Sequence, residues 1–126
     1  MANSIRPVFS SYSFARTRGF FERLGFGVRE EGEVLVVADD GAEIAYLDLS
    51  PPEGEALPEA EFRNETCVIL VDDVMAWHAR IRASGQRFRS MSPPSYRGEP
   101  RVNAWDRLAT AITDPDGNLI WFLQRS

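Results

Sequence analysis

Residues 105–122 read WDRLATAITDPDGNLIWF, and this stretch decides the fold. Two runs of alternating apolar residues flank the pentapeptide DPDGN at 114–118. In such a pentapeptide proline presets φ, aspartate caps the turn backbone, and glycine adopts the positive φ that the turn needs. The stretch therefore predicts a β-hairpin close to the C-terminal end of the sequence.

The same pattern occurs earlier in the chain. A β-branched run at 34–38 is followed by DDG at 39–41 and by an apolar run at 43–49, which predicts a second hairpin. Residues 26–30 predict the strand before it, with a turn at 31–32. The hairpin at 34–49 thus follows another strand directly.

Two segments have the spacing of amphipathic helices. The first covers residues 14–24, with Ser13 as N-cap and Gly25 as the stop. The second begins at Asp72-Asp73, runs to about Ser84 and ends at Gly85. Its apolar face consists of Val74, Trp77, His78 and Ile81.

The two halves of the chain repeat one order of elements: strand, helix, glycine, three strands. We therefore expect an α+β protein of two βαβββ modules, each a curved mixed sheet backed by a helix, with a concave face open to a ligand. The expected boundaries are 1–50 and 65–126 for the modules and 51–64 for a proline-rich linker, all within one domain over 1–126. A short strand at 87–90 and a long loop at 91–103 complete the second module.

Composition narrows the range of functions. The chain has 126 residues and a formal net charge of -5, which argues against nucleic acid as a partner and mildly favours a cationic ligand. No apolar run reaches the roughly 18 residues of a membrane span, and the N-terminus has no apolar signal segment. The single cysteine, Cys67, lies among apolar residues and is expected to be buried and structural. We expect a cytoplasmic protein with no membrane partner.

The sequence offers little for catalysis. A serine or cysteine nucleophile needs a base, and the single histidine, His78, lies on the apolar face of a helix, where we expect a core residue. The paired carboxylates at 39–40 and 72–73 are typical of turns and helix caps. We therefore expect a binding protein with no cofactor.

Three motifs resemble the vicinal-oxygen-chelate superfamily, which includes glyoxalase I, extradiol dioxygenases and bleomycin-resistance proteins. The segment FFERLGF at 20–26 resembles its aromatic-L-G-F motif, VDD at 71–73 its sequence before the second helix, and DPDGN at 114–118 its last turn. The resemblance covers nearly the whole chain and implies the paired βαβββ fold.

Metal-dependent members of this superfamily place His, Gln or Glu on the first and last strands of each half. The matching positions here are Arg6 or Val8, Ala45 or Tyr46, Thr66, and Trp121. None of these is a usual ligand of a divalent metal. We therefore expect no metal site and no metal-dependent enzyme.

Within the superfamily the sequence is most similar to bleomycin-resistance proteins. Pro7-Val8-Phe9 resembles the start of their first strand, and Trp105-Asp106-Arg107 the entry to the seventh. The resemblance implies a homodimer that exchanges its N-terminal strand at Pro7. It further implies a non-catalytic antibiotic-binding protein that sequesters bleomycin-type glycopeptides in clefts shared by the subunits.

Such drugs carry a flat bithiazole and a cationic tail, which fit aromatic faces and carboxylates. The residues that we expect to contact the ligand are Trp105, Phe62, Tyr46, Asp48, Glu65, Tyr96 and Trp121. The alternative for the aromatic residues is ordinary packing in the sheets. Alternatives for the function are the same fold binding an unrelated small molecule, or a metal-dependent glyoxalase or dioxygenase-type enzyme.

Overall fold

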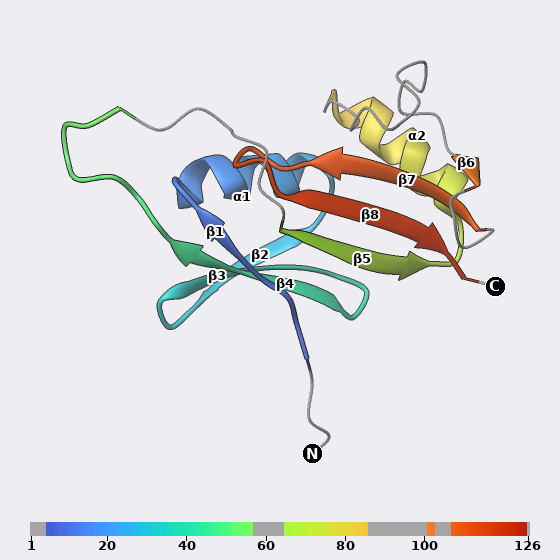
Figure 1. Ribbon diagram of the computed structural model, residues 1–126, viewed down its shortest axis with the longest axis horizontal. Coiled ribbons are helices and arrows are strands. Elements are labelled where there is room, and N and C mark those ends of the chain that lie inside the picture. Colours follow the sequence, from blue (N-terminus) through green and yellow to red (C-terminus); the bar gives the residue numbers. More distant parts are fainter. Residues whose placement is uncertain (1–4, 57–64, 86–100, 103–106, 126) are drawn as a thin grey trace. The chain divides into compact units, whose positions relative to one another are not determined.

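The computed structural model describes residues 5–56, 65–85, 101–102 and 107–125. The chain divides into two compact units, 1–61 and 62–126. Each unit contains a four-stranded sheet and one helix that lies against one side of it (Figure 1).

The first unit follows the order strand, helix, three strands. Its elements are β1 (Val8–Ser11), α1 (Phe14–Arg23), β2 (Gly27–Glu31), β3 (Val34–Asp39) and β4 (Ala42–Asp48). The sheet order is β1-β4-β3-β2, with β1 parallel to β4 and the other pairs antiparallel. The strand β1 is therefore an edge strand that pairs with the last strand of its own unit.

Local signals fix the ends of the elements in this unit. The Ser13 side chain accepts a hydrogen bond from the Arg16 backbone N–H at 3.2 Å, as an N-cap does, and Gly25 after α1 has φ 86°. Asp40 and Gly41 both have positive φ, 45° and 88°, as a two-residue hairpin turn of the type I′ class requires. The predicted helix and hairpin are thus confirmed.

The second unit repeats the arrangement. Its elements are β5 (Thr66–Val71), α2 (Val74–Ser84), β6 (Arg101–Val102), β7 (Leu108–Thr113) and β8 (Leu119–Gln124). The sheet order β5-β8-β7-β6 has the same form as in the first unit, which confirms the predicted pair of βαβββ modules. One detail of the prediction is wrong: β6 lies inside the expected loop 91–103, because pairing with β7 and not a local pattern forms it. The strand expected at 87–90 lies outside the described residues.

Helix α2 packs on its sheet through the predicted apolar face. Val74, His78 and Ile81 are buried, and the Trp77 ring stacks on Phe122 of β8 with 4.6 Å between ring centroids. His78 is 5% exposed, so it is a core residue as expected. The left-handed Gly85, φ 77°, ends the helix.

The DPDGN turn is held by one buried carboxylate. Asp114 accepts hydrogen bonds from the backbone N–H groups of Asp116 and Asn118, both at 2.9 Å, and from the Asn118 side-chain amide at 2.8 Å. Gly117 has φ 89°, and Asp114, Asp116 and Asn118 are all buried. The turn predicted from the sequence is therefore part of the interior, not a solvated loop.

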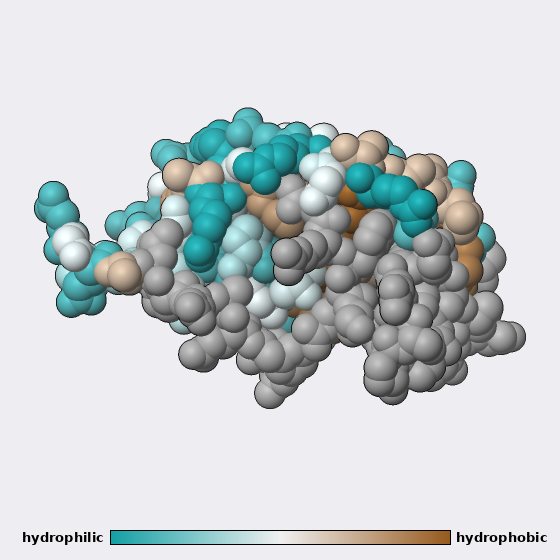
Figure 2. Space-filling view, turned by 90° about the horizontal axis from the view of Figure 1, so that it is seen from above, coloured by the Kyte–Doolittle hydropathy of each residue, from teal (hydrophilic) through white to brown (hydrophobic). Residues whose placement is uncertain are grey.

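The described surface is largely hydrophilic in the view of Figure 2, with apolar residues in smaller patches. The large hydrophobic side chains that remain exposed are Ile5, Val8, Leu47, Leu49, Val68, Leu70 and Met75. None of the helices in the described part of the chain is both long and apolar enough to cross a membrane.

Candidate ligand-binding faces

Each sheet has one side against its helix and one side away from it, which we call the open face. In the first unit the Tyr46 ring lies 5.8 Å from that of Phe21 in α1, so Tyr46 is on the helix side. Because side chains alternate along a strand, Ala45 belongs to the open face. Its cross-strand neighbours Val8 and Val36 share that face.

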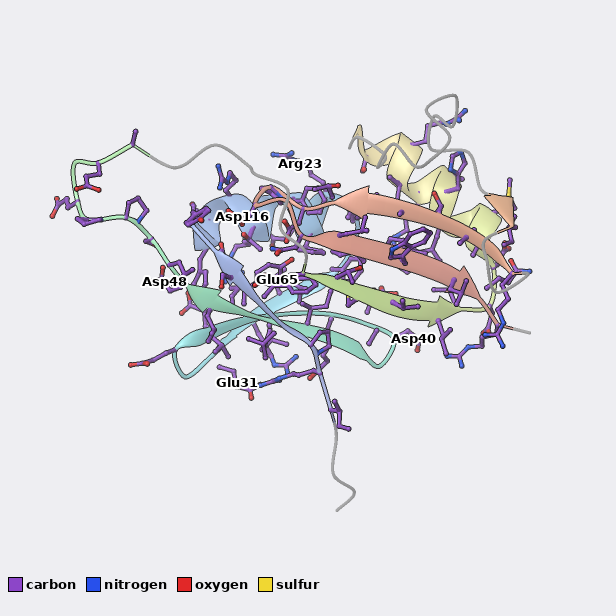
Figure 3. The ribbon with its side chains drawn as sticks, in the orientation of Figure 1. Arg23, Glu31, Asp40, Asp48, Glu65 and Asp116 are labelled. Carbon is purple, nitrogen blue, oxygen red and sulfur yellow. The ribbon has the colours of Figure 1, made fainter. Side chains whose placement is uncertain are left out.

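Four charged side chains form a network on the open face of the first sheet. Arg6 donates from Nη1 to Glu43 at 3.2 Å and from Nη2 to Glu31 at 3.1 Å. Arg29 donates from Nη2 to Glu31 at 3.0 Å and to Glu43 at 2.9 Å. We call this network the charge plate (Arg6, Arg29, Glu31 and Glu43), and Figure 3 shows Glu31 on the side of the sheet away from α1.

The charge plate crosses the whole sheet. Arg6 precedes the edge strand β1 but reaches Glu31 on β2, so its side chain passes over β4 and β3. Those two strands place the small residues Ala45 and Val36 at the centre of the face, where they are 2% and 0% exposed. The ion pairs therefore cover the centre of this open face, whereas Val8 and Leu47 on the same face are 53% and 46% exposed.

Both carboxylates of the plate remain ionised at neutral pH. Hydrogen bonds from Arg6 and then Arg29 hold the pKa of Glu31 below its usual value. The pKa of Glu43 is also lowered, mainly by the hydrogen bond from Arg29. Two guanidinium and two carboxylate groups thus balance one another on this face.

The open face of the second sheet is apolar. Trp121 of β8 points away from α2, since its neighbour Phe122 stacks on Trp77. Val68 and Ala111 lie directly beside Trp121 on the adjacent strands. Val68 is 43% exposed and Leu70, two residues along β5, is 45% exposed. Hydrocarbon exposed beside an indole is suited to an apolar or aromatic group.

Cys67 lies on the other side of β5, toward α2. Burial, with a smaller effect from the charge of Asp114, raises the pKa of its thiol to about 12. The thiolate is the reactive form of cysteine, so Cys67 is a poor nucleophile at neutral pH. The expectation of an unreactive thiol in apolar surroundings fits this placement, although the side chain is half-buried rather than fully buried.

The structure separates the candidate ligand residues. Tyr46 is corrected to a core residue, because it is 0% exposed and packs between Phe9 and Phe21. Asp48, at the end of β4, is exposed on the helix side, and hydrogen bonds from the hydroxyl and backbone of Ser50 lower its pKa.

The other candidates fall in different places. Glu65 is exposed at the start of β5, and its carbonyl accepts from the Leu119 N–H at 3.0 Å (Figure 3). Trp121 alone among the described candidates projects from an open face. The carbonyl of Pro7 accepts from the Ala45 N–H at 3.0 Å, which begins the pairing of β1 with β4. Trp105, Phe62 and Tyr96 lie outside the described residues.

Two of the positions that the sequence analysis compared with metal ligands lie side by side in the structure. On the open face of the first sheet Val8 stands beside Ala45, and two guanidinium groups lie across that face. Within the described part of the chain, no three His, Cys, Asp or Glu side chains come together in a way that could hold a metal ion.

Sequence reasoning missed the charge plate. Arg29 and Glu31 share one face of a strand because they are two residues apart, and this part of the pattern is readable. Glu43 comes close to these two residues only because β2, β3 and β4 pair with one another. Arg6 joins them only because β1 pairs with β4. Only the contact between Arg29 and Glu31 can be predicted from the local sequence.

The fold and the open faces define a class of paired βαβββ proteins, and comparison with known proteins identifies it. Residues 13–122 match the model of the Glyoxalase/Bleomycin resistance protein/Dioxygenase superfamily. The chain therefore belongs to this superfamily.

Similar proteins are bleomycin-resistance and bleomycin-binding proteins. A bleomycin resistance protein of Klebsiella pneumoniae is 26% identical over 98% of this chain and 94% of its own length. The crystal structure of a bleomycin resistance determinant encoded on the transposon Tn5 has a TM-score of 0.76 at 23% identity, with 99% of each chain covered. A bleomycin-binding protein complexed with bleomycin has a TM-score of 0.75 at 22% identity, covering 99% of this chain and 100% of the other. These two structural likenesses concern the fold.

Proposed function

We propose that this protein is a non-catalytic binding protein that sequesters a bleomycin-type antibiotic. The observation that carries the proposal is the apolar open face of the second sheet, where Trp121 stands beside the exposed Val68. A flat heteroaromatic group gains both buried apolar area and ring stacking on such a face. Similarity to the Klebsiella pneumoniae bleomycin resistance protein over nearly the full length of both chains supports the choice of ligand.

The proposal includes a cytoplasmic homodimer in which the drug lies in clefts shared by two subunits. Exchange of the strand that follows Pro7 would pair β1 with the partner's β4 in place of its own. Trp105, Phe62, Tyr96 and Glu65 are the remaining proposed contacts, together with Asp48 for the cationic tail. Light scattering tests the assembly: a mass of twice 14.2 kDa is expected, and a monomer would rule out shared clefts.

Calorimetric titration with metal-free bleomycin and with phleomycin tests the function. We expect stoichiometric binding, weakened about thirtyfold in Trp121→Ala, because an aromatic anchor contributes about 2 kcal/mol. Trp105→Ala is expected to abolish binding. Trp77→Phe is the matched control, since Trp77 lies on the helix side of the same sheet and its ring stack survives in phenylalanine.

Absence of heat with both drugs would exclude this ligand class and favour an unrelated small molecule on the same fold. Metal analysis of the purified protein addresses the enzyme alternative. A stoichiometric transition metal would contradict the non-catalytic proposal.

A further inference from the structure

The charge plate determines what the open face of the first sheet can bind. A group that approaches the centre of this face meets guanidinium and carboxylate atoms, because Ala45 and Val36 beneath them have almost no exposed surface. The four side chains are not deeply buried: their exposed fractions range from 29% for Arg6 to 50% for Glu31. The plate is thus a polar, accessible surface.

The plate has unused hydrogen-bonding groups at one edge. Arg29 makes both of its bonds through Nη2, so among the described residues its Nη1 and Nε N–H groups have no acceptor. Each carboxylate oxygen of Glu31 accepts one hydrogen bond, although an ionised carboxylate has about four acceptor positions. Donors and acceptors are therefore available side by side on Arg29 and Glu31.

The balance of charge disfavours an ionic ligand. An anion drawn to Arg29 meets the carboxylates of Glu31 and Glu43, and a cation drawn to Glu31 meets both guanidinium groups. At the unused groups either ion therefore lies beside side chains of its own charge, which stay bonded to their partners at 2.9–3.2 Å. A neutral group that both accepts and donates meets no such repulsion and displaces only water.

We propose that the charge plate recognises an uncharged planar group carrying an acceptor and a donor side by side, of which a carboxamide is the simplest. Its carbonyl oxygen accepts from the Arg29 guanidinium, and its N–H donates to the Glu31 carboxylate. This inference extends the proposed function to a second face, and it assigns neutral amide groups of a ligand to the first sheet and flat apolar groups to the second.

Three probes of one shape test the inference without the drug: benzamide, benzoate and benzamidinium. They are neutral, anionic and cationic at pH 7 but otherwise nearly alike. The measurement is a two-dimensional ¹H–¹⁵N NMR titration that follows the Arg29 Nε–H signal and the backbone amides of β2 and β3 at constant ionic strength. We expect saturating shifts with benzamide and none with the two charged probes.

Variants distinguish the plate from general binding to the surface. Arg29→Lys removes the guanidinium fork and is expected to abolish the amide shifts in β2 and β3. Arg18→Lys is the matched control, because it makes the same change on α1, on the other side of this sheet. A larger response to benzoate or benzamidinium, no saturating shift with benzamide, or an unchanged response in Arg29→Lys would overturn the inference. Bleomycin calorimetry is separate, so failure of the drug proposal is recognised independently.

Discussion

The two open faces come from the same βαβββ arrangement, yet the chemistry at their centres differs, although Val8 and Leu47 are exposed on the first face as well. The first sheet carries the charge plate across four strands, whereas the second presents Trp121 with Val68 and Leu70. The helix sides of both sheets are alike, with aromatic rings packed between helix and strands, as in Phe21 on Tyr46 and Trp77 on Phe122. The repeat therefore constrains the backbone and the core, while the open faces are free to differ in function.

The largest expected effect is on the rate at which Cys67 reacts, and this rate shows which side of β5 is accessible. Because burial raises the pKa of the Cys67 thiol from 9.0 to about 12, its thiolate fraction at pH 8 falls about a thousandfold. We expect native Cys67 to react with iodoacetamide about a thousandfold more slowly than in urea. Labelling at an ordinary rate would place Cys67 on the exposed side and reverse the two faces of this sheet.

The second effect compares the two sides of the sheet directly. Phe122→Ala removes a ring that is 0% exposed and is expected to lower the free energy of unfolding by about 4 kcal/mol. Val68→Ala, on the open face, is expected to cost less than about 1 kcal/mol. Urea denaturation measures both. Similar costs would mean that Val68 is buried in solution, for example by a second copy of the chain.

The third effect compares the turns of the two units. Asn118→Ala removes a buried hydrogen bond to the Asp114 carboxylate, at a cost of about 2 kcal/mol. Asp40→Asn, in the hairpin turn of the first unit, is expected to leave stability nearly unchanged, because asparagine tolerates positive φ well. Thermal unfolding separates the two variants. A negligible loss in Asn118→Ala would show that this hydrogen bond to the buried carboxylate adds nothing to the DPDGN turn.

The smallest effect on stability concerns the charge plate. The folded pKa values of Glu31 and Glu43 are lowered, so their stabilising contribution is present above the unfolded pKa of about 4.3 and is lost as pH falls below it. The double variant Glu31→Gln, Glu43→Gln is expected to have a slightly lower urea midpoint than wild type at pH 7, and this difference is expected to shrink as the pH falls through the folded pKa values of the two carboxylates. Exposed ion pairs contribute little, so the difference is small.

Glu30→Gln is the control for this prediction, since Glu30 lies on β2 but outside the plate. A difference between wild type and the double variant that does not shrink as the pH is lowered would show that the effect is not electrostatic. In variants of Val68 the change in urea midpoint is expected not to depend on pH in this way, because the face around Val68 carries no ion pair of the charge plate.

Local chemistry made most of the backbone predictable. Ser13 and Asp73 cap their helices, and Gly25, Gly41 and Gly117 have the positive φ that their sequence context predicted. The apolar face of α2 was readable because helical periodicity needs no distant partner. The two-residue strand β6 was not, because only its pairing with β7 defines it.

The candidate site was less predictable, since a strand residue's side depends on register. Tyr46 and Trp121 are both aromatic residues in the last strand of a unit, and the sequence analysis treated both as ligand contacts. Pairing and helix packing place Tyr46 in the core and Trp121 on an open face. A shift of one residue in the register of either strand would have turned its aromatic side chain to the opposite face of the sheet.

The sequence by itself determined the order of elements, the caps, the turns and the superfamily, because these depend on residues close together in the chain. The tertiary structure alone decided the chemistry of the open faces. Arg6 and Glu31 are 25 residues apart, and only the sheet order β1-β4-β3-β2 brings their charges together. Long-range pairing therefore gives the open face of one sheet a charged centre and that of the other an apolar centre within the same fold.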